Sequence, residues 1–301
     1  MEHQGSTFIS GCYTEPGFFY FAKELDELIN EGTSNSSFFR FRDVDKEAQF
    51  RKFNESVGWP AISMATIKKP ETKIVIAISP YGDFWELESV TTKQIVSKIS
   101  GFEGNLRNIV AIDGVFFACG MNREILKRID AENWLSFGPE TLQNEPTIIG
   151  FENMSGYSLS EMYAVGWNGE IWWYNSDNWN KVNSPTSSIL SSLTCASDGF
   201  VYIVGQDGIL IKGRYDNWEL VETGRYENLK DVAYNNGVLY VCSDFGLFKL
   251  EKTGLVDETN FEDTEDKPLT CLYLLETSTE LVSLGLKDVF VKKELNWERL
   301  V

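Results

Sequence analysis

Histidine and cysteine, the side chains that most often carry catalysis and metal binding, are sparse in this 301-residue sequence. His3 is the only histidine. A Ser-His-Asp or Cys-His nucleophile, a histidine-rich metal site and a histidine general base therefore all lack their central residue. No Cys-x-x-Cys pair occurs, and we interpret the cysteines as small buried side chains in a reducing compartment: Cys12, Cys119, Cys195, Cys242 and Cys271.

The other motifs of enzyme chemistry do not appear either. No glycine-rich phosphate-binding motif occurs, and the scattered carboxylates match neither a calcium loop nor a defined catalytic pair. The sequence therefore predicts no catalytic residues, no cofactor and no metal site, and we expect a protein that is not an enzyme.

The charge balance is acidic, which suits either plain solubility, the commoner explanation, or attraction to a basic partner. Asp and Glu number 45 against 27 Lys and Arg, which gives a formal net charge of −18. A phosphate backbone needs a basic surface, so we expect no nucleic-acid binding. No apolar run approaches the roughly 18 residues that span a bilayer, and the N-terminus lacks a secretory pattern. We expect a cytoplasmic protein with no membrane contact.

A segment of the chain recurs at a spacing of about forty residues. "GQDGILIKGRYDNWELV" at 205–221 parallels "GWNGEIWWYNSDNWNKV" at 166–182, and further copies begin at Gly120, Ser243 and Gly285. Upstream of several copies, Asp-Gly or Asn-Gly separates two apolar runs, as in "VAIDGVFFACG" and "VAYNNGVLYVCS". These dipeptides accept positive φ at both turn positions and favour two-residue hairpins.

The resulting unit is a four-stranded antiparallel meander, which is the sequence form of a β-propeller blade. The sequence predicts an all-β fold, a single β-propeller domain over residues 1–301. Seven blades are favoured and six are the alternative. Regular blades are expected at about 61–101, 105–138, 146–183, 189–223, 227–258 and 267–301. An irregular first blade is expected at about 6–58, with a short helix near Lys46–Asn54.

The Gly-x-[Asn/Asp]-Gly and Asn-Trp pattern over residues 105–301 resembles the bacterial YCF48-like and BNR-like propeller repeats. The resemblance implies a propeller fold and leaves function open, because propellers host unrelated activities. The tryptophan recurs once per unit, whereas a binding residue is usually needed once. We therefore interpret the recurring tryptophans as packing between blades: Trp134, Trp179, Trp218 and Trp297.

Departures from the repeat are the better candidates for recognition, because packing does not require them. The turns between the second and third strands should gather on one face, and so should the links between blades. Together they supply a mixed aromatic and polar set suited to protein binding. The candidates are Tyr81, Arg123, Trp167, Gln206, Asp207, Asp244, Phe245 and, from the acidic link "VDETNFEDTEDKP", Asp263, Glu265 and Asp266.

We therefore expect a non-enzymatic protein-binding propeller that is monomeric when free. Its most specific form is a bacterial immunity-type protein that neutralises a basic toxin through an acidic, aromatic-bearing face. Two alternatives stay open. One is a carbohydrate-binding or glycoside-acting propeller, in which paired carboxylates and aromatic rings would hold a sugar. The other is an assembly factor for a larger protein complex.

Overall fold

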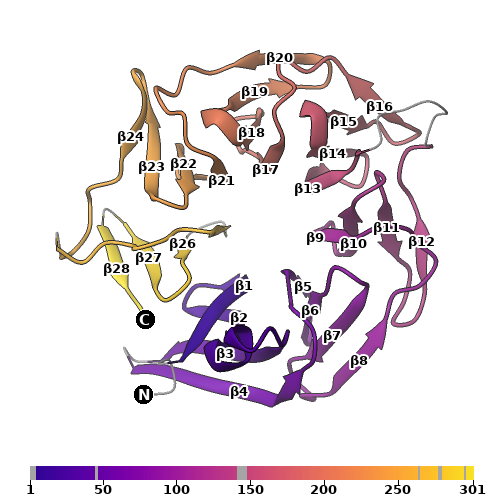
Figure 1. Ribbon diagram of the computed structural model, residues 1–301, viewed down its shortest axis with the longest axis vertical. Helices are drawn as coiled ribbons and strands as arrows, with labels where there is room; N and C mark the ends of the chain where they lie inside the picture. The colour runs from indigo at the N-terminus through magenta and orange to yellow at the C-terminus, as the bar shows by residue number, and fades with distance from the viewer. Residues whose placement is uncertain (1–4, 45–46, 141–147, 264, 277–279, 295) are drawn as a thin grey trace.

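The computed structural model describes residues 5–44, 47–140, 148–263, 265–276, 280–294 and 296–301. Within these residues the strands form seven four-stranded sheets, and each sheet follows chain order. Adjacent strands in every sheet are antiparallel. The sheets stand around a central axis (Figure 1), so the fold is a β-propeller, and the prediction of seven blades is confirmed over six.

The first three blades take up the N-terminal half of the chain. Blade 1 also holds the α-helix α1 (Asp26–Asn30), between its second and third strands. The strands are β1 (Ser6–Glu15), β2 (Phe18–Leu25), β3 (Ser36–Val44) and β4 (Glu47–Val57) in blade 1; β5 (Ser63–Lys68), β6 (Lys73–Ile78), β7 (Asp83–Glu88) and β8 (Gln94–Lys98) in blade 2; and β9 (Leu106–Ile112), β10 (Val115–Gly120), β11 (Ile125–Arg128) and β12 (Trp134–Ser136) in blade 3.

Blades 4 to 7 complete the ring. Single 3-10 turns, η1 (Trp167–Gly169) and η2 (Gln206–Gly208), connect the second and third strands of blades 4 and 5. The strands are β13 (Phe151–Ser158), β14 (Glu161–Gly166), β15 (Ile171–Tyr174) and β16 (Trp179–Val182) in blade 4; β17 (Leu190–Cys195), β18 (Val201–Gly205), β19 (Leu210–Arg214) and β20 (Asn217–Leu220) in blade 5; β21 (Leu229–Asn235), β22 (Val238–Ser243), β23 (Gly246–Glu251) and β24 (Gly254–Asp257) in blade 6; and β25 (Tyr273–Glu276), β26 (Leu281–Leu284), β27 (Val289–Lys293) and β28 (Asn296–Arg299) in blade 7.

Local turn chemistry explains why the hairpins form where they do. Asp113 and Gly114, and likewise Asn236 and Gly237, adopt positive φ as consecutive pairs, as the Asx-Gly signals predict. At Gly208, where φ is +69°, an added Cβ would collide with the Arg225 carbonyl oxygen. In blade 5 the second glycine of the repeat therefore serves both the backbone conformation and the close approach of the next link.

The hydrophobic core lies between the blades. The buried apolar residues that the structure describes form seven clusters, and each joins two neighbouring blades. The Asn-Trp tryptophans pack against the preceding blade: Trp218 meets Tyr163 edge-on with ring centroids 5.8 Å apart, and Trp297 meets Tyr240 in the same way. Their interpretation as interblade packing is confirmed.

Blade 1 differs from its sequence prediction in the position of its short helix, which is α1 (Asp26–Asn30). The short helix expected near Lys46–Asn54 is wrong: Lys46 lies outside the described residues, and Glu47–Val57 is strand β4. Strand β4 pairs with β3 in a register that sets Phe50 opposite Phe41 and Phe53 opposite Phe38.

No helix in the described part of the chain is long and apolar enough to cross a membrane.

The ring closes by side-chain packing between blades 7 and 1. Phe8, Phe21 and their neighbours on blade 1 share a cluster with Val282 and Val289 on blade 7. The Phe8 amide donates to the Leu286 carbonyl at 2.9 Å. Each blade is built from one continuous stretch of chain, and no strand is exchanged between the first and last blades among the described residues.

Candidate functional site

The connections between strands of a four-stranded meander lie alternately on the two faces of the ring. The links that enter each first strand and the turns between second and third strands lie on one side, which we call the link face. The turns between first and second strands and between third and fourth strands lie on the other side, the hairpin face. The sequence-predicted recognition residues all belong to links or turns of the link face.

The first strand of several blades carries a β-bulge near its link-face end. The strand ladders skip one residue at the same place in blades 1, 3, 4, 5 and 6, namely Ile9, Arg107, Glu152, Ser191 and Lys230. A bulge re-aims the side chain at that position. Four of the five bulged residues line the central cavity: Arg107, Glu152, Ser191 and Lys230.

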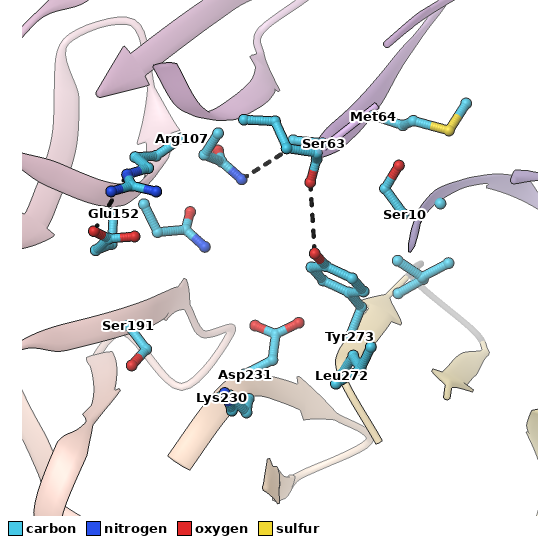
Figure 2. A pocket seen from close by; sticks show the side chains of 15 residues that line it. Ser10, Ser63, Met64, Arg107, Glu152, Ser191, Lys230, Asp231, Leu272 and Tyr273 are labelled. Carbon is cyan, nitrogen blue, oxygen red and sulfur yellow. Dashed lines mark hydrogen bonds and ion pairs between the residues drawn. The ribbon is translucent and has the colours of Figure 1, made fainter. Parts of the chain in front are cut away.

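The central cavity measures about 350 Å³ and is lined by first strands, or the residues that enter them, from all seven blades. Its wall is uneven. Figure 2 shows Arg107 and Glu152 paired on one side, with Nε and Oε1 3.5 Å apart. Lys230 is paired with Asp244 at 3.2 Å, whereas Ile62 and Leu272 make another part of the wall apolar. The central cavity therefore has charged and apolar sectors side by side.

A chain of polar side chains lies directly after the bulges and connects the first strands. Asn153 Nδ2 donates to Ser192 Oγ at 3.1 Å, and Ser192 Oγ donates to Asp231 Oδ1 at 2.5 Å. The Leu274 amide donates to Asp231 Oδ2 at 2.8 Å, so Asp231 bridges blades 5, 6 and 7. Burial raises the pKa of Asp231 to about 6, despite these hydrogen bonds to its carboxylate. We infer that this series of hydrogen-bonded side chains holds the blades together.

The raised pKa of Asp231 makes a contribution to stability that depends on pH. Because the folded-state pKa lies above the usual value, the protonated form is favoured in the folded state, and stability falls as pH rises from about 4 to about 6. We expect the unfolding free energy of Asp231→Asn minus that of wild type to increase by about 2–3 kcal/mol between pH 4 and pH 7. This corresponds to about 1.4 kcal/mol per pKa unit. Urea unfolding at several pH values measures this difference, and a constant difference would contradict the assignment.

Trp167 and the η2 turn lie on the link face as expected. Trp167 is half-buried, and its Nε1 donates to Glu152 Oε1 at 2.6 Å, which places it at the edge of the central cavity. Asp207 is exposed and accepts a hydrogen bond from Ser188 Oγ, and its neighbour Gln206 is partly exposed. Tyr81, in the turn of blade 2, is 60% exposed. Contact with a partner stays a prediction for these four residues.

Arg123 requires a correction, because it does not lie on the surface. The side chain is buried and makes a bidentate pair with Glu170 of the next blade, at 2.7 Å for Nε and 2.5 Å for Nη2. Lys181 and Trp172 also donate to Glu170, and the Arg123 guanidinium lies over the Trp172 ring. Arg123 replaces the repeat's glycine at a position with φ of +58°. Its departure from the repeat serves interblade packing, and a partner cannot reach it.

The remaining predicted residues lie on blades 6 and 7. Asp244 and Phe245 are both exposed, in the turn between β22 and β23. Asp263 and Glu265 are exposed on the acidic link between β24 and β25, whereas Asp266 is partly buried and paired with Arg299. The link is anchored at Phe261, which is buried and bridges to Trp297 of the outer strand.

Sequence reasoning missed two groups of residues. The first is the set of charged and polar bulge residues in the central cavity: Arg107, Glu152, Ser191 and Lys230. Their successive spacing of 45, 39 and 39 residues was a usable signal. The second is a pair of exposed apolar side chains in the links, Tyr226 and Leu269. Within the described residues no group of three or more His, Cys, Asp or Glu side chains is placed to hold a metal ion.

Comparison with known proteins finds similarity in sequence and in structure. No family model matches the sequence. The immune protein Tsi7 of Pseudomonas aeruginosa is 37% identical over 203 residues, which is 66% of this chain. The match spans 65% of the length of Tsi7.

Solved structures agree on the fold. The WD40 β-propeller domain of Doa1 superimposes with a TM-score of 0.69 at 10% identity, covering 99% of this chain and 93% of its own. YCF48 bound to D1 peptide gives 0.67 at 14% identity, covering 95% and 91%. The computationally designed Ika8 protein gives 0.63 at 10% identity, covering 100% and 88%. The YCF48-like resemblance is confirmed at the level of fold. At these identities the structures carry no information on function.

Proposed function

We propose that this chain is a non-enzymatic, immunity-type protein of the bacterial cytoplasm that binds a protein toxin and neutralises it. The observation that carries the proposal is the 37% identity to the immune protein Tsi7. The net charge of −18 adds support for a basic partner, because opposite charges accelerate association and stabilise the encounter. We further propose that the chain is monomeric when free and that its whole length forms one propeller domain.

The link face supports this proposal because it combines exposed aromatic side chains with carboxylates. Tyr81 and Phe245 are exposed there, and Asp207, Asp244 and Asp263 lie on the same side of the ring. Aromatic anchors surrounded by charge are the usual composition of a protein-binding surface. The rigid blades beneath would hold the turns in a fixed arrangement, which lowers the entropy cost of binding.

The proposal is tested by capture followed by a growth assay. Tagged protein retrieves its partner from the native host, and the partner is then produced in a second bacterial host with and without this chain. We expect the partner to arrest growth and this chain to restore it. The designed propeller Ika8 is the matched control, because it shares the fold at 10% identity. A partner that does not arrest growth, or growth restored equally by Ika8, would contradict the proposal.

A further inference from the structure

The three most exposed large apolar side chains of the described residues all lie on the link face, at blades 6 and 7. They are Tyr226 at 89%, Phe245 at 82% and Leu269 at 78% exposure. Tyr226 belongs to the link entering β21, Phe245 to the turn between β22 and β23, and Leu269 to the link entering β25. We call these three residues the docking arc. Exposed apolar groups gathered on one face are characteristic of an interaction surface.

Hydrogen bonds hold the backbone around the docking arc while its side chains project outwards. The Phe245 amide donates to Ser243 Oγ at 3.1 Å, and the Leu269 amide donates to Asp288 Oδ2 at 2.9 Å. Beside Tyr226, the Glu227 carbonyl accepts the Gly208 amide at 2.9 Å. The anchors therefore project from loops fixed to rigid blades, and little conformational entropy would be lost when a partner covers them.

Exposed carboxylates surround the docking arc and form what we call the carboxylate rim. Its members come from η2, from the turn of blade 6, from the acidic link, and from helix α1 of blade 1 and the residue that follows it. They are Asp207, Asp244, Glu262, Asp263, Glu265, Glu27 and Glu31. The acidic link extends from the outer edge of blade 6 across blade 7 towards the centre of the ring (Figure 1).

Three basic side chains near the rim are paired within the chain, whereas Lys267 on the acidic link is exposed and takes part in none of these pairs. Arg225 contacts Asp257 at 2.9 Å, and Lys287 contacts Asp26 at 2.6 Å. Lys230 contacts Asp244 at 3.2 Å. The Lys230 pair offsets the charge of the rim carboxylate Asp244, and the other rim carboxylates outnumber Lys267. The field above the docking arc is therefore negative and attracts a basic surface.

We propose that the docking arc and carboxylate rim form the surface that binds the toxin, with apolar anchors in the centre and Lys or Arg side chains of the partner on the rim. This inference rests on the proposed function and adds the surface and its chemistry. A second copy of the chain fits poorly as the occupant, because two acidic rims would face each other across a symmetric dimer.

Two variants separate the apolar and charged parts of the surface. The first combines Tyr226→Ala, Phe245→Ala and Leu269→Ala, and we expect it to weaken binding of the captured toxin about 100-fold or more, mainly through faster dissociation. The second combines Asp263→Lys and Glu265→Lys. We expect it to weaken binding about tenfold at low salt by slowing association, with the difference shrinking at high salt.

Control variants place the same kinds of substitution, apolar residue to Ala and Asp to Lys, on the hairpin face. Val90→Ala with Phe200→Ala controls for the apolar variant, and Asp177→Lys with Asp216→Lys controls for the charged one. All four positions are exposed and lie in turns of the opposite face. Association and dissociation rates are measured by biolayer interferometry against the purified toxin at two salt concentrations, and a thermal melt of each variant verifies that it is folded.

The outcomes distinguish this inference from the proposed function. If wild type neutralises the toxin and both the docking-arc variant and the rim variant bind as wild type does, the inference is wrong and the proposed function stands. If wild type neutralises no toxin, both are wrong. Sedimentation that shows a dimer, dissolved by the apolar variant, would mean that a second copy covers the arc and would also overturn the inference.

Discussion

Replacing Glu170 with alanine is expected to lower the free energy of unfolding by about 3–5 kcal/mol, because it leaves a buried guanidinium without its counter-charge. Arg123 and Glu170 have fully or almost fully buried side chains. Burial would raise the pKa of Glu170, but hydrogen bonds from Arg123, Lys181 and Trp172 outweigh it and hold the pKa below its usual value. The carboxylate is thus the common acceptor for three side chains, and its loss affects blades 3 and 4 together.

Chemical denaturation followed by tryptophan fluorescence measures this loss, and two controls make it specific. Lys98→Ala removes a partner from an exposed pair with Asp83, and should cost less than about 1 kcal/mol. The double variant Arg123→Gly with Glu170→Ile installs the residues that the repeat has at Gly208 and Ile209. Because it removes both charges and restores glycine at a positive φ, it should be more stable than Glu170→Ala. A double variant as unstable as the single one would contradict the role of the unpaired charge.

The repeat explains why the fold could be predicted from the sequence. Blades 3 to 6 are each specified within about forty residues by Asx-Gly turns and apolar runs, so the local pattern determines the meander. Seven blades then follow from how many times the pattern occurs. Trp218 could be assigned to packing because a tryptophan recurs at the same position of the repeat, although an indole can also bind a ligand. The structure places Trp218 against Tyr163 of the preceding blade.

The site could be predicted less well because its residues act through contacts between blades. Arg123 differs from the glycine of other repeats, which made it a candidate for recognition. Its partner Glu170 lies 47 positions further along the chain, in the next blade. A deviation from the repeat does not reveal whether the side chain faces solvent or the neighbouring blade. The helix expected near Lys46–Asn54 failed for a related reason, since the pairing of β4 with β3 overrides its local preference.

Replacing Trp297 with alanine is the second change with a large expected effect, at about 3–5 kcal/mol of unfolding free energy. Trp297 is 1% exposed, packs against Tyr240 of blade 6, and exchanges backbone hydrogen bonds with Asn260 and Glu262 of the acidic link. Trp218→Ala is the matched control at the same repeat position, and it should cost about 1–2 kcal/mol because Trp218 is only partly buried and loses less buried area. Hydrogen exchange supplies a second measurement: Trp297→Ala should accelerate exchange of the Glu262 amide, whereas Trp218→Ala should not. Equal losses for the two variants would mean that burial does not set the cost at this position. An unchanged Glu262 amide would mean that Trp297 does not hold the link that carries Asp263 and Glu265.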